Sequence, residues 1–195
     1  MRANCFVQEL SLIRNTDLRA FIAEYMEKFV PDYFYVVPAS STGKYHPKYA
    51  LGEGGLVRHT KACVAIAEAL LSLEQNKHLN HDRIISALII HDSFKQGLGT
   101  SKHTKFEHPL FSANAIQLFA KEYHPNMKDE ADEIAKLVIT HMGEWNTSNY
   151  SKVTLPKPHT EEQKFVHMCD YLASRKNIEV NVVYEPPKEE EQQTN

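Results

Sequence analysis

Histidine and aspartate recur in five short groups along this chain, and their side chains are the ones that could carry out chemistry. Imidazole and carboxylate together bind divalent transition metals, and a pair of bound metals is a general means of cleaving phosphate esters. The pattern therefore predicts a metal-dependent hydrolase. The five groups are 54–60 with His59, the pair His91-Asp92, 107–109 with His108, 140–143 with His141, and 168–170 with Asp170.

The adjacent pair His91-Asp92 is the most informative group, because it follows an almost wholly apolar run at 84–90. A charged side chain at the end of a buried helix needs a partner, and a metal would neutralise Asp92 while using the lone pair of His91. Eleven histidines in 195 residues also place several on the surface by chance. We expect ordinary solvated or hydrogen-bonded side chains at His78, His81, His103, His124, His159 and His167.

The composition predicts a globular protein with a sizeable core, since 42% of the 195 residues are hydrophobic and 24% are charged. The cysteines Cys5, Cys63 and Cys169 are far apart and form no CxxC motif, which is typical of reduced thiols and disfavours a disulfide framework. No apolar stretch approaches the roughly 20 residues that cross a bilayer, and the first residues lack the apolar core of a signal peptide. We therefore expect no membrane association and a cytoplasmic location.

A formal net charge of -3 opposes a large, non-specific nucleic-acid surface, because such surfaces carry a basic excess. Part of the acidity lies in the stretch 185–193, which has the composition of a disordered extension. A locally basic cleft therefore stays compatible with the overall charge. Divalent cations would also add positive charge at the site itself.

Apolar residues recur at helical spacing through most of the chain, which predicts an all-α fold. We expect one compact domain at 38–178, an N-terminal helical segment at 1–37 packed on it, and a partly disordered tail at 179–195. The stretch 178–184 alternates as a strand would, but one strand makes no sheet, and the aromatic stretch 33–37 is expected to pack in the core. The expected helices span about 16–30, capped by Thr16-Asp17, then 56–73, 81–91, 109–123, 128–142, and 160–176, opened by a capping box of Thr160 and Gln163.

The candidate ligands fall at helix ends or on inward faces of these helices. Several helices would therefore direct them at one point, which is how helical folds build metal sites. Asp170 and Ser174 are four residues apart and share one side of the last helix. Ser174 could hold Asp170 in place, or it could be a plain cap.

These groups resemble the motifs of the HD-domain superfamily of metal-dependent phosphohydrolases, whose pattern is His, then His-Asp, then Asp. The resemblance runs from about Pro38 to Ile178 and is closest to the HD domain of 3′-to-5′ exoribonucleases, through the stretches 38–47, 54–60, 141–145 and 155–158. It implies a compact helical HD-domain fold with a metal site between converging helices. The implied ligands are His59, His91, Asp92 and Asp170 for one metal and His108 and His141 for a second, with Asp92 bridging.

Two departures from the family pattern bear on the second metal. Ser93-Phe94-Lys95 follows Asp92 where the family commonly has Ile-Gly-Lys, and Met142 follows His141 where many relatives have another histidine. We expect one or two divalent transition metals. Mixed imidazole and carboxylate ligation suits manganese, iron, cobalt, nickel or zinc, and the sequence does not choose among them.

The resemblance implies hydrolysis by metal-activated water, with Asp92 and Lys95 as the catalytic residues. Lys95 lies where many family members have a lysine near the substrate phosphate, and it would donate to a non-bridging oxygen. A solvated lysine at a helix end is an equal alternative. The substrate-binding candidates are Lys95, Arg58, which precedes His59, and Trp145, which could stack on a base or pack in the core.

The expected substrate is a nucleotide or a short single-stranded oligonucleotide. The exoribonuclease relatives usually carry a separate nucleic-acid-binding domain before the HD domain, and the residues before Pro38 are too few to form one. Cyclic-dinucleotide phosphodiesterases of the superfamily carry a Gly-Tyr-Pro element after the equivalent of His141, and this chain lacks it.

Two alternative functions stay open. One is a 3′-to-5′ exonuclease acting on single-stranded RNA or DNA, and the other is a non-catalytic nucleotide-binding HD module. The basic, glycine-containing loop at 96–105 could clamp phosphates or could be an ordinary surface connection, and it matches no phosphate-binding fingerprint. The sequence assigns no oligomeric state.

Overall fold

The structure is a computed structural model that describes residues 2–40, 43–44, 46–98 and 101–186. These residues form helices and include no strand, so the predicted all-α fold is confirmed. None of the described helices is both long and apolar enough to cross a bilayer. The α-helices are α1 (Val7–Ser11), α2 (Thr16–Lys28), α3 (Gly55–Leu71), α4 (His81–Ile90), α5 (His108–Tyr123), α6 (Lys128–Val138) and α7 (Glu161–Ala173), with short 3-10 helices at Arg2–Phe6, Asp32–Tyr35, Lys48–Ala50, Glu74–Asn76 and Pro125–Met127.

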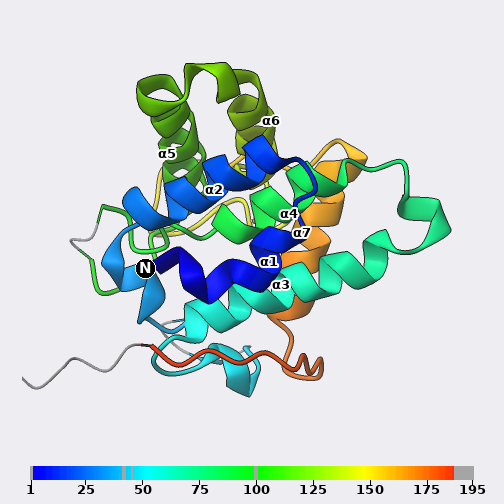
Figure 1. The fold of residues 1–195 in the computed structure, drawn as a ribbon. Coiled ribbons are helices and arrows are strands. Elements are labelled where there is room, and N and C mark those ends of the chain that lie inside the picture. Colours follow the sequence, from blue (N-terminus) through cyan, green and yellow to red (C-terminus); the bar gives the residue numbers. More distant parts are fainter. Residues whose placement is uncertain (1, 41–42, 45, 99–100, 187–195) are drawn as a thin grey trace, which may run out of the picture.

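Helix α4 lies at the centre of the fold. Every residue from Ile84 to Ile90 is buried, as the apolar run at 84–90 predicts. The helix contacts α1, α2, α3, α6 and α7. Figure 1 shows it between the antiparallel pair α5 and α6 on one side and α3 on the other. Because a helix that is apolar all round must be surrounded by other elements, the residues that follow Ile90 are delivered into the interior.

The N-terminal segment packs on this core and also holds the chain just after α4. Phe34 and Tyr35 are buried, as expected for core packing of the aromatic stretch. The Tyr25 hydroxyl lies 3.1 Å from the Ser93 hydroxyl. The Tyr33 hydroxyl donates to the carbonyl oxygen of Gly97 at 2.7 Å. The first helices therefore fix the turn that carries Asp92 and Lys95.

The cap of α2 differs from the predicted one. Asn15, rather than Thr16-Asp17, is the N-cap, and its side-chain oxygen accepts from the backbone N–H groups two and three residues later, each at 3.0 Å. Two cap-forming residue types stand side by side here, so composition alone could not choose between them. The predicted capping box of Thr160 and Gln163 at the start of α7 is confirmed.

Helix α6 ends at Val138, before the predicted limit at 142. The Thr140 hydroxyl donates to the carbonyl oxygen of Leu137 at 3.1 Å. Gly143 then adopts a positive φ of 56°, and a Cβ at this position would lie 2.2 Å from the ring of His167. Only glycine fits this turn, which follows His141, and His141 itself lies after the end of α6.

The stretch predicted as a strand, 178–184, is extended but pairs with no strand among the described residues. Its alternate residues Val180, Val182 and Tyr184 pack on the core, and the Tyr184 hydroxyl donates to the carbonyl oxygen of Tyr35 at 3.1 Å. The alternation therefore reflects packing of one face on the helices. Of the predicted disordered tail, residues 187–195 lie outside the described residues.

Asp82 connects the start of α4 to the turn between α1 and α2. Its carboxylate accepts from the backbone N–H groups of Arg14, at 3.0 Å, and Asn15, at 2.7 Å. Burial opposes ionisation, but these hydrogen bonds outweigh it and lower the pKa of Asp82. A carboxyl whose pKa is lower in the folded state stabilises the protein above its unfolded pKa, and this contribution is lost as the pH falls through the folded pKa.

We therefore expect Asp82→Asn, which imitates the protonated carboxyl, to lower the free energy of unfolding at pH 7 by about 1–2 kcal/mol. The difference from the wild-type protein should shrink as the pH falls below the ordinary range of an aspartate carboxyl. Urea unfolding at several pH values measures both effects. Glu122→Gln on the exposed face of α5 is the control. An Asp82→Asn difference that is constant with pH would contradict the assignment.

Candidate metal centre

Three candidate ligands, His91, His108 and His141, are oriented by the same kind of hydrogen bond. In each ring Nδ1 lies 2.7 Å from the backbone carbonyl oxygen three residues earlier. A carbonyl only accepts, so Nδ1 carries the proton and, in a neutral imidazole, Nε2 keeps a free lone pair. Metal-binding histidines are commonly held in this way through their second nitrogen. All three rings are thus oriented to bind a cation through Nε2.

The local sequence explains where these rings sit. His91 directly follows α4 and His141 follows α6, at helix ends where backbone carbonyls lack intrahelical partners. His108 is the first residue of α5 and is followed by Pro109, whose missing N–H is not needed at a helix start. Helix ends thus supply both the turn and the acceptor that orient each ring.

The candidate ligands form two groups, and in each group the ligand atoms all lie within 4.8 Å of one another. We call them the first and second ligand groups. The first combines α3, the end of α4, and α7, and the second combines the turn after α4, the start of α5 and the turn after α6. The first ligand group is His59, Cys63, His91 and Asp170, and the second is Asp92, His108 and His141.

Asp92 lies between the two ligand groups and faces both. Its Oδ1 is 3.0 Å from His108 Nε2 and 3.6 Å from His141 Nε2. Its Oδ2 is 3.4 Å from His91 Nε2 and 3.9 Å from His59 Nε2. A single carboxylate therefore offers one oxygen to each ligand group.

The donor atoms fit divalent cations. His108 Nε2 and His141 Nε2 are 3.0 Å apart, although both rings use Nδ1 as the donor. Two lone pairs that face each other repel unless a positive charge lies beside them. Nε2 of His91 is buried and has no hydrogen-bond partner among the described residues. A cation bound by each ligand group would satisfy these nitrogen atoms.

The protonation states also suit cation binding. Burial opposes ionisation of Asp92, but the charge of Lys95 and the neighbouring histidines hold its pKa well below the usual range. Burial also opposes ionisation of Asp170, but the hydrogen bond with His59 and the nearby ring of His91 hold its pKa well below the usual range. Burial lowers the pKa of His108 to about 4, and nearby Lys95 acts in the same direction. At neutral pH both carboxylates are ionised and His108 is neutral, as metal ligands must be.

A cleft of about 360 Å³ lies beside the ligand groups, and Lys95, His108 and Asp170 line it on their side. On the other side Trp145 stacks on Tyr171, with ring centroids 5.4 Å apart and planes at 12°. The indole is 50% exposed. Further lining residues with polar side chains are Ser40, His46, Thr104, His167, Ser174 and Arg175.

The structure brings together all six residues predicted as metal ligands and places Lys95 and Trp145 at the cleft. Lys95 Nζ is 2.6 Å from Asp92 Oδ2. Arg58 is not brought to the cleft, because its guanidinium is used elsewhere. It donates to four backbone carbonyl oxygens, those of Tyr49, Leu51, Glu53 and Tyr184.

The structure also shows where Ser174 and the loop 96–105 lie. Ser174 is the C-cap of α7 and its hydroxyl donates to the carbonyl oxygen of Tyr171 at 2.7 Å, so it acts as a plain cap. In the loop 96–105, which could be a phosphate clamp or an ordinary surface connection, Thr104 lines the cleft. Residues 99–100 of that loop lie outside the described residues.

The motif pattern did not indicate four residues of the site, namely Cys63, Tyr171, Arg175 and His46. Cys63 follows His59 by one helical turn, so the spacing of four residues could have identified it. Arg175 follows Tyr171 by the same spacing and lies over its ring, with the guanidinium carbon 4.4 Å from the ring centroid. His46 lies in an irregular segment, where no spacing rule applies.

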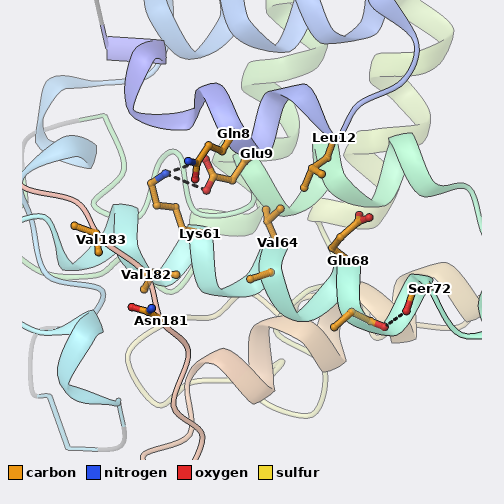
Figure 2. Close-up of a pocket in the computed structure, with 12 residues that line it drawn as sticks. Gln8, Glu9, Leu12, Lys61, Val64, Glu68, Ser72, Asn181, Val182 and Val183 are labelled. Atoms are coloured by element: carbon orange, nitrogen blue, oxygen red, sulfur yellow. Dashed lines mark hydrogen bonds and ion pairs between the residues drawn. The ribbon is translucent and has the colours of Figure 1, made fainter.

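A larger cavity, of about 870 Å³, lies on another face of α3, between α1 and the extended residues 181–183 (Figure 2). None of the candidate ligands lines it. The charged side chains Lys61 and Glu9 neutralise each other there, with Lys61 Nζ at 3.0 and 2.9 Å from the two carboxylate oxygens. Size alone therefore does not identify the site, and the smaller cleft at the ligand groups is the candidate functional site.

Comparison with protein-family models, with curated proteins and with solved structures finds no match to this chain. Its candidate function therefore depends on the residues and geometry of this site.

Because Asp92 faces both ligand groups, its substitution should remove more metal than substitution of a residue in one group. We expect the reconstituted wild-type protein to hold two divalent cations, Asp170→Asn to hold one, and Asp92→Asn to hold none. Elemental analysis after desalting measures the content, and circular dichroism checks the fold. Asp129→Asn, on the exposed face of α6, is the control. Wild-type metal content in Asp92→Asn would refute the shared-carboxylate arrangement.

Proposed function

We propose that this chain is an HD-domain metal-dependent phosphohydrolase that cleaves a phosphate ester of a nucleotide or short oligonucleotide. The observation that carries the proposal is the position of Asp92, a buried carboxylate that faces two ligand groups beside a cleft. Divalent cations bound there would activate water and neutralise charge on the phosphate oxygens. The residues that carry the resemblance to HD-domain phosphohydrolases are the same ones, which supports the proposal.

Lys95 is placed to act on the substrate phosphate. Its side chain is 14% exposed, and it lies between Asp92 and the cleft. Burial disfavours its charged form, but Asp92 and Asp170 outweigh this effect and raise the pKa of Lys95. The ammonium group is therefore charged at neutral pH and can donate to a non-bridging oxygen, whose negative charge grows in the transition state.

The aromatic wall of the cleft suits a nucleobase. Trp145 and Tyr171 stack with nearly parallel rings, and Arg175 extends the same surface. Every base has a π-face that can stack on an aromatic ring, so such a surface binds bases with little sequence preference. A phosphate ester without a base would have no group to stack on Trp145 and Tyr171. The cleft therefore favours a nucleotide over a simple sugar phosphate.

The function is tested by incubating metal-reconstituted protein with nucleoside mono-, di- and triphosphates, cyclic nucleotides and short and long single strands. Turnover of a small substrate that persists as salt increases supports the proposal, because few phosphate contacts are then involved. Cleavage of long strands alone, with binding that collapses in salt, would favour the exonuclease. Nucleotide binding by metal-loaded protein without any turnover would show a binding module and refute the enzyme.

Replacement of Lys95 should lower turnover without removing metal. For Lys95→Met we expect turnover to fall about 10²- to 10³-fold, the usual effect of losing one donor to transition-state charge. Metal content by elemental analysis should stay at the wild-type value. Lys157→Met, an exposed lysine whose charge partner is Glu144, is the control. Full turnover in Lys95→Met would limit Lys95 to its ion pair with Asp92 and exclude a role in catalysis.

Replacement of Trp145 should weaken binding of the base. For Trp145→Ala we expect KM for a nucleotide to rise about 5- to 150-fold, since stacking on one aromatic ring contributes about 1–3 kcal/mol. KM for ribose 5-phosphate, which has no base, should change little. Tyr150→Ala, an aromatic side chain that is 99% exposed and outside the cleft, is the control. Equal changes for both substrates would argue against base stacking.

A further inference from the structure

Cys63 lies among the side chains of the first ligand group, although the motif pattern contains no cysteine. It is fully buried on α3, one helical turn after His59. Its Sγ is 3.6 Å from His59 Nε2. The sulfur also lies within 4.8 Å of the ligand atoms of His91 and Asp170. Four potential ligand atoms of three chemical kinds thus surround one point.

Burial of a cysteine does not by itself explain this position. Cys169 is equally buried and directly precedes Asp170 on α7, yet it belongs to neither ligand group among the described residues. Neighbouring residues on a helix point about 100° apart, whereas residues four apart lie on one face. The spacing of His59 and Cys63 therefore directs both side chains to the same point, and the spacing of Cys169 and Asp170 does not.

The chemistry of the sulfur then determines which cations fit. Thiolates favour softer metals, whereas manganese and magnesium prefer oxygen ligands. We propose that Cys63 is a thiolate ligand of the first ligand group and makes this group select zinc, cobalt or ferrous iron over manganese and magnesium. This inference rests on the metal centre of the proposed function. The second ligand group contains no sulfur, so the two halves of the centre differ in preference.

The binding step is a simple exchange of a proton for a cation. The S–H bond of Cys63 breaks, the proton passes to solvent, and the electron pair of the sulfur forms the bond to the cation. Neither partner is oxidised or reduced.

The proposal is tested with cobalt, because a thiolate bound to Co²⁺ gives a sulfur-to-metal charge-transfer band in the near ultraviolet. We expect this band in the cobalt-loaded wild-type protein and in Cys169→Ala, the matched control. Cys63→Ala should lack the band while its second ligand group still binds cobalt. In competition between zinc and manganese, the ratio of zinc affinity to manganese affinity should fall in Cys63→Ala by at least roughly 10- to 100-fold. Loss of a residue that only supports a ligand already costs that much metal affinity.

The outcomes separate this inference from the proposed function. Cobalt bound by the wild-type protein without the band would overturn the role of Cys63 and leave the metal centre intact. Failure of the wild-type protein to bind any cation would refute the centre itself. If Cys63→Ala does not fold, X-ray absorption of the zinc-loaded wild-type protein tests whether sulfur binds the metal. A sulfur neighbour at about 2.3 Å from zinc is expected, and nitrogen and oxygen neighbours alone would overturn the proposal.

Discussion

The rest of the structure depends on the buried carboxylate of Asp92. This residue has no exposure to solvent, and moving an ionised carboxylate out of water costs several kcal/mol unless other groups compensate. Lys95 supplies a compensating positive charge, with its Nζ at 2.6 Å from Asp92 Oδ2. The helices around α4 must therefore carry polar groups to this point, although most of their buried residues are apolar. That requirement places the candidate site where the core meets the cleft.

The turn after α4 shows how the fold holds this charge. Ser93 and Phe94, which directly follow Asp92, both have specific partners. Ser93 lies 3.1 Å from the hydroxyl of Tyr25 on α2. Phe94 is buried, and its backbone N–H donates to the hydroxyl of Ser112 on α5 at 3.2 Å. Both residues are thus anchored on neighbouring helices, which hold the turn that carries Asp92.

The features that could be predicted from the sequence depend on local spacing. Helical periodicity predicts α3, α4, α5 and α7 within a few residues, because these helices bury long apolar faces. The five-residue α1 is too short to show a period, and apolar spacing predicts α6 to continue to 142, beyond its end at Val138.

The pair His91-Asp92 could be singled out because it follows an apolar run, whereas the full set of candidate ligands was implied by the resemblance to HD-domain proteins. The role of Arg58 could not be predicted, since its acceptors include a carbonyl 126 residues further along the chain. Cys63 lies between these cases. Its spacing of four residues from His59 predicts that both side chains lie on one face of a helix, but the motif pattern contains only histidine and aspartate.

The contact between His59 and Asp170, at 3.0 Å, joins residues that are 111 positions apart. Forming this contact closes a long loop, and packing of α7 on the other helices has to offset the entropy that the chain loses on closure. A ribosome delivers α3 and α4 long before α7, and domains generally fold as the chain emerges. Until α7 docks, His59 lacks its Asp170 partner. The first ligand group is therefore completed last, whereas the second ligand group contains no residue of α7.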